Sequence, residues 1–141
     1  MAQVSASEAL DLIQLISGVN KRLEQAVGAR LKPTGIAVEQ YRVLRELERA
    51  DGRTMGDLAA AVFVDAPTLT KIIDRMIAAG LVYRSPDARD RRKVLILISE
   101  SGQATLADLK ALVEAPEDRL VGPLAPGEIR QLRSLLKNLL P

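Results

Sequence analysis

The sequence predicts a mainly α-helical fold that carries one small β-hairpin, and three observations favour this fold class. Aliphatic residues recur every three or four positions through most of the chain, which is the spacing of the buried side of a helix. Two runs of β-branched and aliphatic residues, Leu81–Arg84 and Val94–Ile98, are instead typical of strands. Aromatic residues make up only 2% of the chain, so the core between these elements is expected to be aliphatic.

The composition indicates one folded unit and lacks Cys and His, two residue types that often carry out catalysis or bind metals. The chain has 141 residues, of which 48% are hydrophobic, which suits one domain with a sizeable core. It contains no Cys and no His, which excludes disulfides, cysteine nucleophiles and metal sites built from these residues. No spacing marks a catalytic carboxylate pair or an activated nucleophile, so we expect no enzymatic activity and no cofactor. Without a signal-peptide pattern or a long apolar run, a cytoplasmic protein with no membrane partner is expected.

The first predicted helix is long and has a wide apolar side. Ser5 or Ser7 can cap it, and its periodic pattern continues to Leu31. Its apolar residues are Leu12, Ile13, Leu15, Ile16, Val19, Leu23, Val27 and Leu31. A helix buried within its own domain and a helix that packs on a second subunit both fit this pattern. The shortness of the chain favours the second interpretation.

A helix-turn-helix is predicted in the middle of the chain. We expect helices over Val38–Arg49, Asp57–Val62 and Ala66–Ala79. Thr54 and Asp65 are placed to cap the second and third of these, and Pro67 lies in the first turn of the third, where its missing N–H costs nothing. Two short helices separated by a turn of three or four residues have the form of a helix-turn-helix.

The polar side of the Ala66–Ala79 helix carries hydroxyl and cationic groups. They are Thr68, Thr70, Lys71 and Arg75. Such groups in the N-terminal half of a helix can reach base edges and phosphates in a major groove of DNA. An ordinary solvated face is the alternative, because most surface helices have one. The hairpin that follows directly after Gly80 favours the DNA interpretation.

The loop of that hairpin, Ser85–Lys93, is basic and too long for a tight turn. Between Lys71 and Lys93, seven Lys or Arg residues stand against three Asp, although the formal net charge of the whole chain is only +2. A solvated tip is the usual meaning of such a loop, but cations beside a helix-turn-helix match a wing that enters a minor groove. We predict that Asp90 holds Arg92 or Arg84 and so keeps the loop in shape.

The last third of the chain is predicted to be helical. Ser99 caps a helix that includes Gly102 and continues to Val113, and Pro116 either kinks or ends it, or lies in the first turn of a restarted helix over residues 114–118. Pro126-Gly127 is interpreted as part of a turn before a final helix over Glu128–Leu140. The broad aliphatic side of that final helix needs a partner.

The segment Thr68–Gly102 resembles the MarR family of winged-helix transcriptional regulators. The residues that carry the resemblance are Thr68 and Thr70, Gly80-Leu81-Val82, Arg84, Asp90-Arg91-Arg92, and Ser99 with Gly102. The segments Gln40–Leu44, Leu58-Ala59 and Leu124–Leu140 fit the same pattern. Ile77 departs from it, because family members commonly have a charged residue there, and Pro116 interrupts a helix that is usually continuous.

The resemblance implies one MarR-like unit, with a winged helix-turn-helix lobe at about residues 36–98 and dimerisation helices at about 5–31 and 99–141. The homodimer would place its recognition helices about 34 Å apart, in successive major grooves of a pseudo-palindromic operator in double-stranded DNA. The candidate DNA contacts are Thr68, Thr70, Lys71 and Arg75 in the helix and Arg84, Arg89, Arg91 and Arg92 in the wing.

The resemblance also implies a repressor that is released by a small, often phenolic or aromatic, ligand. The ligand cleft would lie between the DNA-binding lobe and the dimerisation helices, with Tyr41 and Arg42 or Arg45 nearby. A cationic group beside an apolar cleft suits a small aromatic or carboxylate effector, but these three residues fit ordinary core and surface positions equally well. A winged-helix module for protein–protein contact is the alternative function, and the basic residues kept in helix and wing argue against it.

Overall fold

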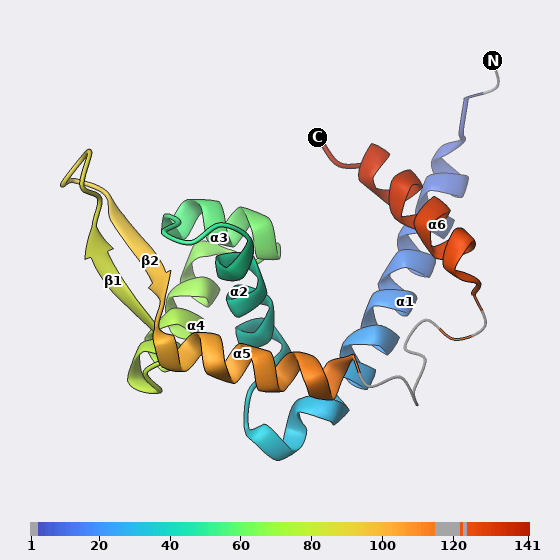
Figure 1. The fold of residues 1–141 in the computed structure, drawn as a ribbon. Coiled ribbons are helices and arrows are strands. Elements are labelled where there is room, and N and C mark those ends of the chain that lie inside the picture. The colour runs from blue at the N-terminus through green and yellow to red at the C-terminus, as the bar shows by residue number, and fades with distance from the viewer. Residues whose placement is uncertain (1–2, 115–121, 123) are drawn as a thin grey trace. The chain divides into compact units, whose positions relative to one another are not determined.

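The computed structural model describes residues 3–114, 122 and 124–141, and its mainly helical fold confirms the predicted class. The elements are α1 (Ala6–Leu31), a 3-10 turn η1 (Lys32–Thr34), α2 (Val38–Arg49), α3 (Met55–Val62), α4 (Ala66–Ala78), β1 (Val82–Pro86), β2 (Val94–Ile98), α5 (Glu100–Val113) and α6 (Pro126–Asn138) (Figure 1). The interpretations placed on Pro116 and on a restarted helix fall largely outside the described residues.

The chain divides into two compact units. One is Glu24–Ala115, and the other combines Met1–Leu23 with Pro116–Pro141. We call the first the winged unit and the second the terminal unit. Helix α5 lies within the winged unit, where it packs against α2.

The winged unit has an aliphatic core that α2, α3, α4 and α5 share with the hairpin. Its fully buried side chains are Leu31, Val43, Leu44, Leu47, Leu58, Leu69, Ile73, Met76, Ile96, Leu106 and Leu109. In α4 the buried positions are Leu69, Ile72, Ile73 and Met76, as the helical spacing predicts. The opposite side of α4 is therefore left for solvent or for a partner.

Side-chain caps fix where three of the helices begin in this unit. The Thr54 hydroxyl accepts the Asp57 N–H at 3.1 Å, and the Asp65 carboxylate accepts the Thr68 N–H at 2.8 Å. The Ser99 hydroxyl accepts the Gly102 N–H at 2.9 Å. These caps satisfy backbone N–H groups that a helix start otherwise leaves without a partner, so the boundaries agree with the sequence within one or two residues.

The hairpin pairs β1 with β2 in antiparallel register, from Val82 opposite Ile98 to Pro86 opposite Val94. The predicted first strand, Leu81–Arg84, is wrong at both ends. Leu81 lies outside β1, in the turn that follows α4, where its N–H bonds to the Met76 carbonyl at 2.9 Å. Strand pairing then continues to Pro86, which leaves a loop of residues 87–93.

In the terminal unit, the predicted limits of the last helix are wrong. Helix α6 begins at Pro126 because proline is well tolerated at the first helical positions, and it ends at Asn138. Ser5, not Ser7, caps α1 by accepting the Glu8 N–H at 3.2 Å. Both helices expose many large apolar side chains, namely Leu10, Leu12, Ile13, Leu15, Ile16 and Val19 in α1 and Leu132, Leu135 and Leu136 in α6. An apolar surface of this kind is unfavourable if it remains in contact with water.

Candidate nucleic-acid interface

The four candidate DNA contacts of α4 all lie on its exposed side. They are Thr68, Thr70, Lys71 and Arg75. The Thr70 hydroxyl donates to the Ala66 carbonyl at 3.0 Å, which fixes its orientation and leaves oxygen lone pairs free to accept. Lys71 and Arg75 lie one turn apart on the helix, so their cationic groups are displayed on a common side. The structure thus presents donors, acceptors and positive charge together on one exposed helix face.

Asp65 sets the orientation of that helix's first turn. Hydrogen bonds from the side chain and the backbone N–H of Thr68 lower the pKa of the Asp65 carboxyl, and Lys71 contributes in the same direction. A carboxylate at a helix N-terminus also complements the helix dipole. Asp65 therefore stabilises the start of α4 as an anion.

We expect Asp65→Asn to lower the melting temperature at pH 7, because asparagine still accepts the Thr68 N–H but carries no charge. A carboxyl whose pKa is lower in the folded state stabilises the protein above its unfolded pKa of about 3.9, and this stabilisation is lost as the pH falls through the folded value. The difference between the wild type and the variant should shrink below about pH 4. Thermal denaturation between pH 3 and pH 7 measures it, with Asp108→Asn, in the middle of α5, as the control. A difference that stays constant to pH 3 would contradict this role.

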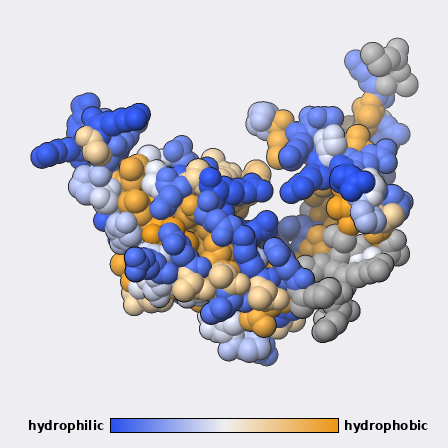
Figure 2. All heavy atoms as spheres, viewed as in Figure 1, coloured by the Kyte–Doolittle hydropathy of each residue, from blue (hydrophilic) through white to orange (hydrophobic). Residues whose placement is uncertain are grey.

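The wing loop is closed by its own hydrogen bonds. The Asp87 N–H donates to the Lys93 carbonyl and the Lys93 N–H to the Asp90 carbonyl, both at 2.9 Å. The Asp90 carboxylate accepts the Arg92 N–H at 3.1 Å and the Arg92 Nε at 3.3 Å. Asp87 likewise accepts the Arg89 N–H at 3.0 Å. The two aspartates thus turn their charge toward the loop, while Arg89 and Arg91 are exposed and the Arg92 side chain is 92% exposed. Hydrophilic atoms cover the end of the hairpin in Figure 2.

Arg84 has a different neighbour from Arg92. Of the two arginines considered for Asp90, it is Arg92 that lies against that carboxylate, whereas an Nη of Arg84 lies 2.8 Å from Asp74 of α4. The ion pair between Arg84 and Asp74 ties the first strand of the wing to the side of α4 that carries the candidate contacts.

Two residues that the sequence pattern did not single out join the wing to the helices. Arg53 forms an isolated bridge with Ile96, with its N–H to the Ile96 carbonyl at 3.1 Å and its carbonyl to the Ile96 N–H at 2.8 Å. The Asp51 carboxylate accepts the Ile98 N–H at 2.9 Å. In the sequence, Asp51-Gly52 signals only the end of a helix, because a bridge of one residue has no pattern of its own.

The hairpin, α4 and α5 meet at the Leu81 carbonyl. This oxygen accepts the Ser99 N–H at 3.0 Å and the Ser99 hydroxyl at 3.0 Å. Gly102 lies so close that a Cβ atom there would be 2.1 Å from the same oxygen. The pairing of a serine with a glycine three residues later therefore has a direct physical cause in this fold.

The residues considered for a ligand are structurally occupied. Tyr41 is buried, and burial raises its pKa, with Arg45 next acting to lower it. The Arg45 guanidinium lies 5.9 Å from the centre of the Tyr41 ring, and Arg42 pairs with Glu24. A hollow of about 300 Å³ elsewhere in the winged unit is lined by Leu47, Glu48, Asp51, Ile98, Gln103 and Leu106. Tyr41, Arg42 and Arg45 do not line that hollow.

Comparison with known proteins agrees with this geometry. A sequence model of the MarR family matches residues 34–93. The multiple antibiotic resistance protein MarR of Escherichia coli is 31% identical over 136 residues, which are 96% of this chain and 94% of the relative. The structure of a mutant MarR from E. coli complexed with operator DNA has a TM-score of 0.83 and 30% identity, and the match covers 99% of this chain and 100% of that one. CouR from Rhodococcus jostii bound to p-coumaroyl-CoA has a TM-score of 0.81 and 32% identity, with 96% and 95% covered.

A helix-turn-helix followed by a basic hairpin defines a winged-helix DNA-binding regulator of transcription. The identity to a relative over almost its full length makes the assignment more specific. The chain belongs to the MarR family. Proteins of this family are transcriptional regulators and not enzymes. None of the described helices is long and apolar enough to cross a membrane.

Proposed function

We propose that the protein is a dimeric repressor that binds a pseudo-palindromic operator and leaves it when a small ligand binds. The observation that carries this proposal is the exposed side of α4 beside a basic wing within one unit, since α4 and β1 pack together. Thr68, Thr70, Lys71 and Arg75 would read the major groove, and Arg89, Arg91 and Arg92 would enter the flanking minor groove. We assign no catalytic step to any of these residues, and we place the protein's action in the cytoplasm, where bacterial operators lie.

Affinity in this proposal comes mainly from phosphate neutralisation. The positive charge of the chain is concentrated in the α4–wing segment, while the net charge of the whole chain is only +2. Each neutralised phosphate releases condensed counterions, so binding should weaken steeply as salt rises. Arg84 is expected to contribute less than the loop arginines, because its charge is already compensated by Asp74.

The second part of the proposal is that binding of a small molecule releases the protein from its operator DNA. CouR, which is similar to this chain over almost its whole length, was crystallised with p-coumaroyl-CoA. Tyr41, Arg42 and Arg45 remain the candidate ligand residues here, and a carboxylate ligand would have to compete with Glu24 for Arg42. The effector class we propose is therefore a small aromatic or carboxylate compound.

The test of this function starts from random DNA. A double-stranded library with a random centre of about three helical turns, enough for two half-sites about one turn apart, is selected with the wild-type protein. The enriched duplex is then titrated by fluorescence anisotropy at several salt concentrations. The proposal expects two inverted half-sites, one dimer per duplex and release by a member of a panel of aromatic carboxylates. Enrichment of no sequence at all would favour the alternative function, a module for protein–protein contact.

Dimerisation should depend on the apolar surface of the terminal unit. Leu135 of α6 is 56% exposed within the single chain, and many apolar side chains of α1 are similarly exposed. We expect Leu135→Glu to raise the dimer dissociation constant at least about a hundredfold, because an unpaired carboxylate would be buried in an apolar interface. Analytical ultracentrifugation measures it.

Ser134→Glu is the control for that variant, because it adds the same charge on the other side of α6. It should leave the dimer intact. If Leu135→Glu still sediments as a dimer at the concentration used for the wild type, α6 is not part of the dimer interface. Loss of the dimer with unchanged operator affinity would contradict the requirement for paired recognition helices.

A further inference from the structure

We propose that Glu46 is a positioning residue for the wing, which acts through Arg53 and contacts no DNA itself. The inference rests on the proposed function, since it concerns how the wing is held against a duplex. Neither residue belongs to the recognition helix or to the wing loop, and the pair is formed between α2 and the segment that leads into α3.

Arg53 is part of the base of the wing through its backbone. Its N–H and carbonyl both bond to Ile96, at 3.1 and 2.8 Å, so it forms an isolated β-bridge with β2. Asp51 secures Ile98, two residues further along the same strand. Ile96 is fully buried and Ile98 nearly so, which fixes this end of the hairpin in the core.

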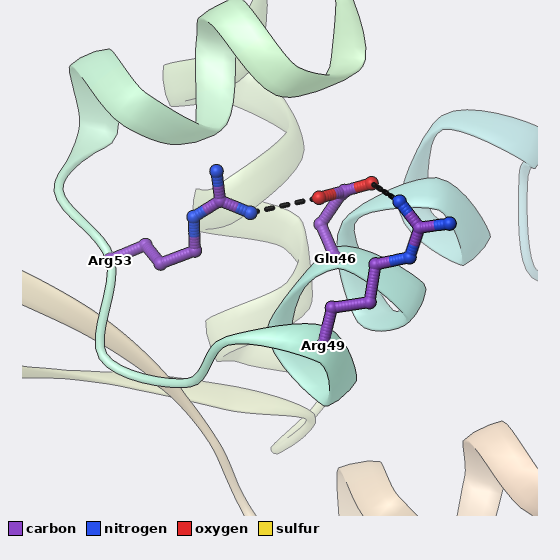
Figure 3. Close-up of polar contacts among 3 residues, drawn as sticks. All are labelled: Glu46, Arg49 and Arg53. Atoms are coloured by element: carbon purple, nitrogen blue, oxygen red, sulfur yellow. Dashed lines mark hydrogen bonds and ion pairs between the residues drawn. The ribbon is translucent and has the colours of Figure 1, made fainter.

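The side chain of Arg53 is held by Glu46, as Figure 3 shows. The Glu46 carboxylate lies 2.8 Å from Arg53 and 3.5 Å from Arg49, one carboxyl oxygen toward each. The side chains of Glu46 and Arg53 are only 21% and 23% exposed, whereas that of Arg49 is 64% exposed. Since water screens a covered pair less, the bond to Arg53 is the stronger of the two.

The helix that carries Glu46 is fixed in the core. The neighbours of Glu46 on α2, Val43, Leu44 and Leu47, are all buried in the core. Arg53 also directly precedes Thr54, the cap of α3, so any displacement of Arg53 shifts both the wing base and the start of the helix-turn-helix. Glu46 thus connects a rigid core helix to the point where the two DNA-binding parts meet.

This connection complements the ion pair on the other strand. Arg84 of β1 is paired with Asp74 of α4, and Arg53 beside β2 is paired with Glu46 of α2. Each strand of the hairpin is therefore tied to a different helix. If one of these ion pairs is lost, the wing can tilt about the other. A smaller fraction of the molecules then has the wing in the orientation that fits a DNA groove.

The direction of the effect separates positioning from simple charge. Replacing Glu46 by glutamine makes the protein more positive, and charge alone would tighten its binding to a polyanion. Release of Arg53 or Arg49 toward phosphates would act in the same direction. A positioning role predicts the opposite, weaker binding.

The experiment compares Glu46→Gln with Glu48→Gln, both in the dimeric full chain. Glu48 lies on the same helix and pairs with Lys110 of α5, so this control removes the same charge and one ion pair without touching Arg53. The probe is the palindromic duplex selected by the wild type. We expect Glu46→Gln to lose about twofold to fivefold in affinity per half-site, the range that a partly exposed ion pair contributes, and Glu48→Gln to bind equally well or more tightly.

Two further readouts report on the mechanism. Hydrogen exchange of the Ile96 amide in the free protein should be faster in Glu46→Gln and unchanged in Glu48→Gln, because the bridge to Arg53 opens more often. The dependence of affinity on salt should keep its wild-type slope, because the variant retains every cation that meets a phosphate. Arg53→Lys retains the charge and a donor for Glu46, so it should bind within about twofold of the wild type.

Wild-type or tighter binding by Glu46→Gln, unchanged exchange at Ile96, or a reduced salt slope would each overturn the inference. Failure of the wild type to enrich any duplex would count against the proposed function instead. In that case the exchange measurement still decides whether Glu46 holds the base of the wing. If Glu46→Gln does not fold, Arg53→Gln is put through the same measurements, and normal exchange at Ile96 in that variant would also overturn the inference.

Discussion

Gly102→Ala is expected to destabilise the winged unit by at least about 3 kcal/mol, the upper end of what overpacking a core costs. A Cβ atom at this position would lie 2.1 Å from the Leu81 carbonyl oxygen and 2.8 Å from Ile98. The oxygen cannot simply move away, because it accepts two hydrogen bonds from Ser99. Either α5 shifts away from the hairpin or these bonds break.

Chemical denaturation of the purified variant measures this effect, and Gly56→Ala is its matched control. Gly56 also lies in a helix of the winged unit, but the nearest atom to an added Cβ there is 4.0 Å away. Alanine is a better helix former than glycine, so Gly56→Ala should be neutral or stabilising by up to about 1 kcal/mol. Equal stabilities for Gly102→Ala and the wild type would show that α5 packs differently from the arrangement described.

Arg91→Ala and Arg92→Ala are each expected to weaken operator binding by about 1–3 kcal/mol per half-site without unfolding the protein. Both side chains are exposed at the end of the wing, so their removal exposes no core. Arg92 should also show a smaller second effect on the loop, because its side chain lies against Asp90.

Fluorescence anisotropy across a salt series measures both variants against Lys32→Ala, which removes one exposed cation in η1. If an arginine neutralises a phosphate, the magnitude of the slope of log affinity against log salt should fall by about one for each phosphate left without its arginine. The control should keep its slope and most of its affinity. Wild-type affinity in both arginine variants would remove the wing tip from the interface.

Local signals in the sequence predicted most of the fold. Thr54, Asp65 and Ser99 each accept a backbone N–H at a helix start, and all three positions are recognisable because capping acts within three or four residues. The apolar spacing in α4 likewise identified the buried side, and so by elimination the exposed side where the candidate DNA-binding residues lie.

Interactions between distant residues were not predictable from the same signals. The bridge from Arg53 to Ile96 and the pair of Glu46 with Arg53 depend on how α2, the turn and β2 come together in space. The arginine that Asp90 holds was similarly open, because both Arg84 and Arg92 lie within a few residues of it. Only the fold shows that Arg92 lies against Asp90, whereas Arg84 pairs with Asp74 of α4.

The self-contained wing loop has a consequence for how such a protein can diversify. Residues 87–93 are closed by bonds among themselves, and the base of the hairpin is secured separately by Arg53 and Asp51. Loop sequence and length can therefore drift, or be exchanged between relatives, at little cost to folding. The Ser99–Gly102 junction has no such freedom. A change in the loop should therefore stay local, whereas a change at the Ser99–Gly102 junction should disturb the packing of α5 against the hairpin.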